Sequence, residues 1–542
     1  MSVRNALVLL LALSTLTLLV GCGGSSSPTV VPPPSGSFSN SNLSGTYVFS
    51  VSGEDPSGNT LAMAGTFTAN GQGGNGTGGI NGGTIDINDA AFAAASPVIP
   101  PVTNAPIKNT SFYSVGVDGR GSMTLGTSTP LGNITFEFVL TSSTHGLVTE
   151  FDKNGSGSGT IDLQTSGLTQ SSFAGPYAFS LAGVDLSDNP DATAGAFTLD
   201  QNGNITAGSG VQDFDDAGFA YTNQALSGSA VLGTGTAPGS ATLATDTFGT
   251  LSFDFYAIDA THLKFIETDS LPILSGDVFT QTGASIPTGA MVFALAGLDS
   301  SGPVAAGGLM TSAGAGSFPS GLEDLNDAGN LSPAQLIFSG TPAGAAGVGG
   351  RIDVNFSGFS PAFQFAIYPY SGGGGGVLML ETDGLGAIMA GAAYAQSATS
   401  FAASQGYGLN LSGSNGAEVD DIAEFTAGSA TSSPNVTGIL DENDDGATNK
   451  PETLSGTYTP DSPATGRGSI VVPTLAYGIL ELDLEYYVVD SSTIIFIEGD
   501  TNQVSVGTFE LQTPSNSSGA VRPHVFTARS LTRPHGALQK KK

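Results

Sequence analysis

Hydrophobic and polar residues alternate over short stretches along most of the chain, and Gly, Asn or Asp turns separate these stretches. A period of two, as in Phe253-Asp-Phe255-Tyr-Ala257, is typical of a β-strand that buries one face. The clearest part of the chain predicts eight strands, at 177–183, 192–199, 204–213, 224–232, 239–245, 250–258, 262–269 and 274–281. Turns as short as Asn202-Gly203 would join neighbouring strands into an antiparallel meander.

The same pattern occurs four times. Each unit opens with a similar strand, and the copies begin at Tyr47, Tyr177, Met291 and Tyr407, at offsets of 130, 114 and 116 residues. Each unit then has a short acidic segment, which we expect to be a turn after the third strand, and a later strand that ends in Glu-x-Asp. Landmarks that recur in one order indicate a tandem repeat. We expect repeats at 43–165, 173–282, 288–396 and 401–513.

An open meander of this length would expose two strand edges, which invite aggregation. Closing the meander gives an eight-stranded up-and-down barrel. The predicted fold class is therefore all-β, a tandem array of four antiparallel eight-stranded up-and-down meander modules. An eight-bladed β-propeller and paired β-sandwiches fit the same number of strands. The repeat period of eight strands rather than four favours barrels over the propeller.

The first strands of two units carry a family resemblance. Gly45-Thr-Tyr47 and Gly175-Pro-Tyr177 resemble the Gly-x-Trp opening of lipocalins and related calycin barrels, with tyrosine in place of tryptophan. The third and fourth units, with Met291 and Gly406-Tyr407, lack the motif. The resemblance implies a barrel whose interior captures a small ligand.

The chain begins with Arg4 and an apolar run from Ala6 to Val20, which is typical of an export signal. This run is shorter than the roughly 20 residues that span a bilayer as a helix. It ends at Cys22 in Leu-Val-Gly-Cys, which resembles the lipobox of bacterial lipoproteins. That resemblance implies a signal peptide at 1–21 and a diacylglycerol on the sulfur of Cys22. Because Gly23 rather than Asp follows, it also implies sorting to the outer membrane.

Composition limits the other partners. The net charge is −32, with 46 acidic and 14 basic residues, which argues against a nucleic-acid partner. Cys22 is the only cysteine, so the mature chain cannot form an internal disulfide. Residues 22–42 are rich in Gly, Ser and Pro and are expected to form a flexible tether. The basic tail at 514–542 is expected to be disordered, with contact to anionic lipid or polysaccharide as the alternative to a solvated terminus.

The acids have a predicted position. In an up-and-down meander, the turns after odd-numbered strands share one end, so the acidic segments and the Glu-x-Asp strand ends should form one rim. The turns that contain Arg120, Arg351 and Arg467 should lie at the other end. Hard cations such as Ca²⁺ bind carboxylate and amide oxygens, which makes a cation site one interpretation and capping of β-turns the other. The candidate ligands are Asp86, Asp89, Asp213, Asp216, Asp324, Asp327, Asp441, Asn443 and Asp445.

Four glutamates end the seventh strands on the same face as apolar residues: Glu150, Glu267, Glu381 and Glu498. They are expected near the barrel mouths, where they would accept hydrogen bonds from a ligand or from neighbouring loop N–H groups. Burial without such partners would be costly.

No catalytic motif is evident. The chain has four histidines, no Cys/His metal cluster and no Gly-x-Ser-x-Gly elbow. We therefore expect a non-enzymatic, lipid-anchored envelope protein whose modules are structural or adhesive and bind glycans or other surface components. Small-ligand capture, with an apolar cavity in each barrel, and an extracellular polymer-degrading enzyme are the alternatives.

Overall fold

The computed structural model describes residues 33–515, except 35, 188, 235–236, 333–335, 359–361 and 474–481. Cys22, the signal segment, most of the tether and nearly all of the basic tail lie outside these residues. No helix in the described part is long and apolar enough to cross a membrane.

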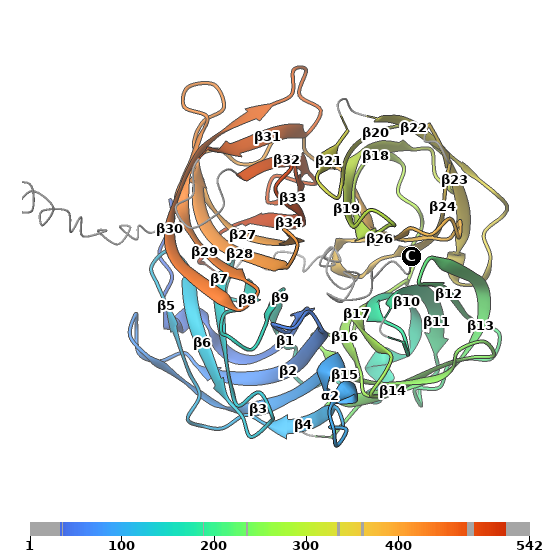
Figure 1. Cartoon of the computed structure of the whole chain (residues 1–542), viewed down its shortest axis with the longest axis horizontal. Coiled ribbons are helices and arrows are strands. Elements are labelled where there is room, and N and C mark those ends of the chain that lie inside the picture. Colours follow the sequence, from blue (N-terminus) through green and yellow to red (C-terminus); the bar gives the residue numbers. More distant parts are fainter. Residues whose placement is uncertain are drawn as a thin grey trace, which may run out of the picture.

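The described chain forms four closed antiparallel barrels of eight strands each (Figure 1). This confirms the predicted fold class over the propeller and the sandwiches. Each barrel closes because its last strand pairs with its first, as β9 (Ser156–Leu163) does with β1 (Ser44–Glu54). In the first and third barrels the fourth strand is split into two pieces, β4 with β5 and β21 with β22.

The first barrel also contains β2 (Thr60–Asn70), β3 (Gly78–Asp89), α2 (Ala90–Ala94), β4 (Val102–Pro106), β5 (Phe112–Val115), β6 (Arg120–Gly126), β7 (Asn133–Leu140) and β8 (His145–Glu150). The second consists of β10 (Gly175–Val184), β11 (Pro190–Leu199), β12 (Gly210–Asp216), β13 (Phe219–Val231), β14 (Gly239–Thr245), β15 (Gly249–Ala257), β16 (His262–Glu267) and β17 (Ile273–Thr280).

The third barrel consists of β18 (Gly289–Leu298), β19 (Pro303–Ser312), β20 (Phe318–Asp327), β21 (Asn330–Leu331), β22 (Leu336–Pro342), β23 (Ile352–Ser357), β24 (Phe363–Tyr370), β25 (Gly376–Glu381) and β26 (Ile388–Ala395). The fourth consists of β27 (Gln405–Ser414), β28 (Glu418–Ala427), β29 (Asn435–Asp444), β30 (Ala447–Pro460), β31 (Arg467–Val472), β32 (Leu482–Val488), β33 (Thr493–Glu498) and β34 (Val504–Leu511). Short 3₁₀ turns lie at Asn40–Asn42, Gln170–Phe173, Val348–Gly350 and Gly372–Gly374.

The acidic segments are strand ends rather than turns. In the second barrel, Asp213 to Asp216 complete β12, and Asp216 still pairs with Asp191 of β11. The turn itself is Ala217-Gly218, both with positive φ. The prediction of an acidic turn is therefore wrong in this detail, because the antiparallel pairing continues through the acids.

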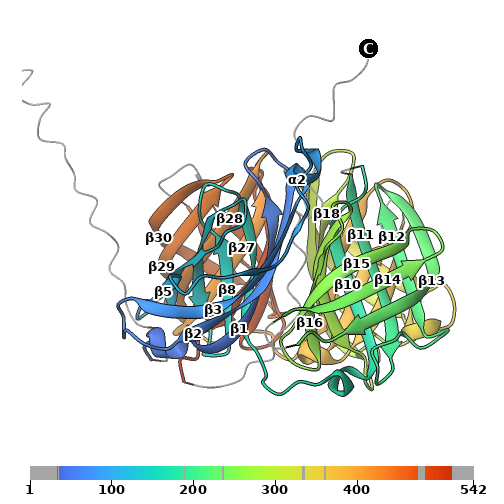
Figure 2. The same cartoon turned by 90° about the horizontal axis from the view of Figure 1, so that it is seen from below.

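The four barrels form a closed ring. The second strand of each barrel packs against the last two strands of the next: β2 on β16 and β17, β11 on β25 and β26, β19 on β33 and β34, and β28 on β8 and β9. Figure 1 shows the barrels around a common centre, and Figure 2 shows the first and second barrels side by side. Because each boundary uses equivalent strands, the ring has approximate fourfold symmetry within a single chain.

Each barrel has its own hydrophobic core, and further apolar clusters lie between barrels. The cluster that joins the second barrel to the third is rich in small side chains, such as Ala192, Ala194 and Ala196 on β11. These residues alternate with inward-facing ones, so β11 buries both of its faces. Burial on both faces explains why this strand has a nearly continuous apolar sequence rather than an alternating one.

Candidate ligand-binding site

The first aspartate of each acidic segment lies at a boundary between barrels. In the second barrel, Asp213 accepts two hydrogen bonds from Arg351 of the third, at 2.6 and 2.9 Å, and another from Tyr368. The next boundary repeats this arrangement, since Asp324 accepts from Arg467 at 2.6 and 2.9 Å and from Tyr487 at 2.6 Å. The arginines were expected at the end of each barrel opposite to its own acids. In the structure, Arg351 and Arg467 instead bond the acids of the preceding barrel.

The other two boundaries keep only part of this arrangement. Asp441 of the fourth barrel pairs with Arg120 of the first, where Val139 stands in place of the tyrosine. Asp86 of the first barrel faces no arginine among the described residues of the second barrel. Burial raises the pKa of Asp86 to about 7, helped by the nearby carboxyl of Asp254.

In three of the four acidic segments the third residue is an asparagine that also bonds across the boundary. Asn443 donates to the main-chain oxygens of Glu150 and Gly155, both at 2.8 Å. Asn88 and Asn326 make the equivalent bonds, to main-chain oxygens that include those of Glu267 and Glu498. The Glu-x-Asp strand ends are therefore the acceptors of the asparagines of the preceding barrel.

Four of the candidate cation ligands take part in these boundary contacts: Asp213, Asp324, Asp441 and Asn443. Asp86, Asp89, Asp213, Asp441 and Asn443 are buried, whereas Asp216, Asp327 and Asp445 are half-buried beside turns. Asp324 is also half-buried. No three His, Cys, Asp or Glu side chains among the described residues converge as a metal site would require. The Ca²⁺ interpretation stays a prediction.

The four strand-end glutamates are almost completely buried at the ends of their barrels. Burial raises the pKa of each side chain, and the carboxyl two residues further on adds to the effect. Glu498 accepts hydrogen bonds from the Asp483 N–H and from Gln503. No N–H or hydroxyl donor among the described residues reaches either carboxylate oxygen of Glu150, Glu267 or Glu381. The carboxyls of Asp269 and Asp383 lie within hydrogen-bond reach of Glu267 and Glu381.

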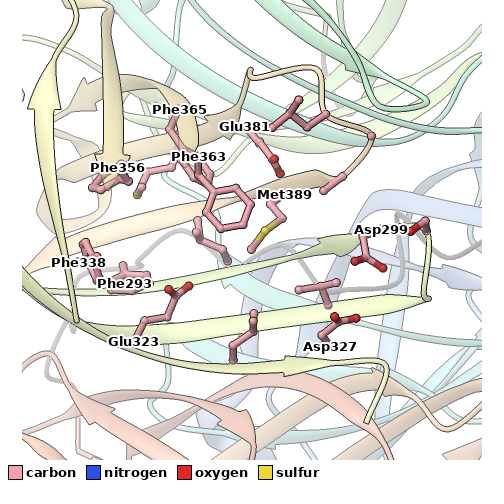
Figure 3. A pocket seen from close by; sticks show the side chains of 18 of the residues that line it. Phe293, Asp299, Glu323, Asp327, Phe338, Phe356, Phe363, Phe365, Glu381 and Met389 are labelled. Atoms are coloured by element: carbon pink, nitrogen blue, oxygen red, sulfur yellow. The ribbon is translucent and has the colours of Figure 1, made fainter. Parts of the chain in front are cut away.

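Glu381 opens onto a cavity of about 300 Å³ inside the third barrel (Figure 3). Its walls are mostly apolar and include Phe293, Phe338, Phe356, Phe363, Phe365, Met310, Met379 and Met389. Its polar lining includes Asp299, Glu323, Asp327 and Glu381, and no Lys, Arg or His. In the fourth barrel the corresponding space is only about 10 Å³, so the prediction of a cavity in every barrel does not hold there.

The third barrel differs from the other three at a pair of facing residues on its first and second strands. In the other three barrels a tyrosine on the first strand lies beside a phenylalanine on the second, as Tyr177 and Phe197 do at a centroid distance of 5.9 Å. In the third barrel the same pair is Met291 and Met310. Two flexible side chains replace two rigid rings, which leaves room above them.

A third substitution places a carboxyl inside the barrel. Glu323 of β20 pairs with Gly308, which lies opposite Phe293 on an inward-facing row. The equivalent positions in the other barrels are Ile85, Gln212 and Leu440. Burial raises the pKa of Glu323 to about 8, and one of its oxygens has no hydrogen-bond partner among the described residues.

Comparisons with known proteins carry no argument about the fold or the function of this chain. No family model and no curated protein matches the chain. A solved structure assigned as an AttH protein from Nitrosomonas europaea is 13% identical and covers 48% of this chain and 98% of its own, with a TM-score of 0.18. The P pilus usher PapC translocation pore is 8% identical and covers 86% of this chain and 98% of its own, with a TM-score of 0.13. Neither similarity supports an inference about function.

Sequence reasoning placed the strand-end glutamates near the barrel mouths and, in the small-ligand alternative, an apolar cavity in each barrel. It missed Glu323 and did not single out the third barrel. An alignment of the four repeats gives a signal for both, because Met291 and Glu323 are the places where the third unit departs from the others. It also missed the pairing of Arg351 and Arg467 with acids, for which the sequence offers no signal beyond the recurrence of an arginine in three of the four units.

Proposed function

We propose that this protein is a non-catalytic, lipid-anchored envelope protein that captures a small ligand in its third barrel. The observation that carries the proposal is the cavity of about 300 Å³, which lies in one barrel and is lined mainly by Phe and Met side chains. Cavities of this size and lining, with a few polar groups, are typical of small-molecule sites. The three substitutions Met291, Met310 and Glu323 support the proposal because they distinguish the third barrel from the other repeats.

The other barrels serve as a scaffold in this proposal. Their contacts with neighbours hold the third barrel on two sides, through β25 and β26 on one side and β19 on the other. A diacylglycerol on Cys22 and the tether at 22–42 would hold the ring at the outer membrane. This anchoring rests on the lipobox resemblance, and the absence of labelled fatty acid on the expressed protein would contradict it.

Capture is tested with the apolar fluorophore N-phenyl-1-naphthylamine and the soluble chain 33–515. We expect saturable fluorescence enhancement with about one site per chain. Met310→Phe restores the side chain found in the other barrels at this position and should abolish binding while the melting temperature stays the same or rises.

Ile337→Ala is the matched control, because Ile337 lies on the outside of the same barrel and is 75% exposed. Its binding should be unchanged. Binding that survives Met310→Phe, or that is lost in Ile337→Ala, would show that the probe occupies the surface and would contradict capture in the cavity.

A further inference from the structure

The charged groups of the cavity are all acidic, and they come from opposite walls. Figure 3 shows the carboxyls of Glu381 and Glu323 reaching toward the cavity from different strands, whereas Asp299 and Asp327 lie together at one end. Glu381 comes from β25, and Glu323 and Asp327 come from β20. A ligand in this cavity therefore meets carboxyl groups, which accept hydrogen bonds when ionised and can also donate one when protonated. No basic side chain is among the residues that line the cavity.

The environment of Glu381 is a second observation, independent of the cavity, that indicates a bound ligand. Glu381 is 0% exposed, and among the described residues the only group within hydrogen-bond reach of its carboxyl is the carboxyl of Asp383, which has the same sign. Its electrostatic neighbours are the carboxyls of Asp383, Asp215 and Asp299, all of the same sign. A buried carboxyl in this environment costs free energy unless a donor or a cation reaches it.

Charge and shape together restrict the ligand. An anionic head group would lie among four carboxyls, and a purely apolar ligand would leave Glu381 and Glu323 unsatisfied. A protonated amine makes charge-assisted hydrogen bonds to a carboxylate and is attracted by all four carboxyls. The phenylalanine rings that line the rest of the cavity suit a hydrocarbon body and also attract a cation through their faces.

Resting on the capture function proposed above, we propose that the third barrel binds amphiphilic amines, with the ammonium group between Glu381 and Glu323 and the hydrocarbon part among the phenylalanines. The position of Glu323, where the other barrels have Ile85, Gln212 and Leu440, is what makes this site specific to the third barrel.

Binding also moves a proton. Burial, together with the neighbouring carboxyls, raises the pKa of Glu381 to about 10, so this carboxyl is protonated in the free protein at pH 8. An ammonium ion favours the ionised form. The protonated carboxyl and the ammonium ion therefore give a carboxylate–ammonium pair, and the carboxyl proton goes to solvent.

The test compares octylamine, octanol and octanoate by titration calorimetry at pH 8, where the amine is protonated. We expect octylamine to bind at least roughly tenfold more tightly than octanol, because a charge-assisted bond is about twice as strong as a neutral one. Octanoate should not bind detectably. Repeating the titration in buffers of different ionisation enthalpy should show release of roughly one proton per octylamine bound.

Two variants locate the charge. Glu381→Gln and Glu323→Gln should each weaken octylamine roughly tenfold and change octanol binding by less than about twofold. Glu381→Gln should also reduce proton release to the share that comes from Glu323, whose pKa is about 8. Glu267→Gln is the matched control, because Glu267 occupies the equivalent strand end in the second barrel, is as deeply buried and also has no N–H or hydroxyl donor at its carboxylate oxygens among the described residues.

The outcomes separate the two proposals. Equal affinity for octylamine and octanol, or octylamine binding that Glu381→Gln and Glu323→Gln leave unchanged, would overturn the amine class while capture stands. Failure of octylamine, octanol and N-phenyl-1-naphthylamine alike would overturn capture itself. Melting curves of each variant establish that it is folded before binding is interpreted.

Discussion

His145 shows how this ring holds a buried ionisable side chain. Its Nδ1 lies 2.6 Å from Oδ1 of Asp162, and its Nε2 lies 3.1 Å from Oε2 of Glu510 in the fourth barrel. Burial opposes the charged form, but the two carboxylates outweigh burial and raise the pKa of His145 to about 10. Its pKa in an unfolded chain is about 6.5. The imidazolium form therefore stabilises the folded state.

Replacing His145 should have a pH-dependent cost. Because the folded pKa lies above the unfolded one, the stabilisation is fully present below about pH 6.5 and is lost as pH rises toward 10. We expect His145→Gln to lower the free energy of unfolding by about 3 kcal/mol at pH 6, since Asp162 then loses its buried partner. Urea denaturation at pH 6 and pH 10 measures the difference, which should shrink at the higher pH.

His262→Gln is the comparison for that experiment. His262 bonds Asp277 at 2.6 Å, but Asp277 keeps a second partner in Lys264 at 2.7 Å. The loss should therefore be smaller than for His145→Gln. An equal loss at both pH values for His145→Gln would contradict the assignment of a charged pair.

Replacing Glu381 should have the opposite effect on stability to replacing His145. Its folded pKa of about 10 lies above the unfolded value of about 4.3, so the folded state loses stability as pH rises between these values. Glu381→Gln removes this cost. We expect the melting temperature of the ligand-free protein to rise by about 2–4 °C at pH 8 and to change little at pH 4. A fall at pH 8 would show that the carboxyl is satisfied in the free protein.

At the scale of strands, the boundary between the second and third barrels differs from the others at the third residue of the acidic segment. Three barrels have an asparagine there, but the second has Asp215. Neither oxygen of this buried carboxyl meets a hydrogen-bond partner at normal geometry among the described residues. Burial and the nearby Asp383 raise the pKa of Asp215 to about 8. Below that pH the protonated group can donate, as the asparagines do.

Asp215→Asn should therefore strengthen the boundary between the second and third barrels at high pH. The folded pKa is raised, so the wild-type chain loses stability as pH rises through the range up to about 8, and the variant does not. We expect a gain of about 1–3 kcal/mol at pH 9 and little change at pH 4, measured by chemical denaturation.

Asn326→Asp makes the reverse exchange at the next boundary, where Asn326 donates three bonds of 3.0–3.1 Å. It should destabilise the chain at pH 9 by a similar amount. The same response in both variants would contradict a donor role for this position.

The pattern of the sequence predicts most strands well and one poorly. For the second unit the predicted 192–199 and 239–245 agree with β11 and β14, whereas the predicted 204–213 lies early relative to β12. The reason is that Asp200 and Asn204 form a turn stabilised by side-chain bonds to the backbone, so the apolar residues around Ile205 belong to a loop. Period-two alternation carries no information on such local bonds.

The candidate site was predictable only in part. Strand parity places Glu381 on the inner face, because side chains alternate along a strand. A cavity depends instead on how volumes sum across the barrel, so Met291 and Met310 are informative only once strand pairing is known. Contacts such as that between Asp324 and Arg467 join residues 143 positions apart and depend on how barrels pack.

At the scale of the whole molecule, the ring has one seam that no interdomain linker crosses, between the fourth barrel and the first. Side chains close it: Arg120 pairs with Asp441, and Asn443 bonds main-chain oxygens of the first barrel. Gln512, which directly follows β34 of the fourth barrel, also joins the first barrel. It donates to the main-chain oxygens of Asp118 and Leu140 at 2.7 and 3.1 Å.

Breaking this seam should open the ring. We expect the double variant Arg120→Ala, Asn443→Ala to increase the radius of gyration in small-angle X-ray scattering, because no linker holds these two barrels together. The control Arg467→Ala, Asn326→Ala removes equivalent contacts where residues 396–404 connect the barrels. It should lower stability with a smaller change in size. Equal changes in size would mean that the linkers do not restrain the barrels.

Equivalent strands meet at each boundary, so every unit turns the chain through about the same angle, and the fourth step brings it back to its start. A duplication that added a unit would find no vacant place, and a deletion would expose two apolar faces with nothing to cover them. Copy number is thus fixed by geometry, whereas the interior of any single unit stays free to diverge.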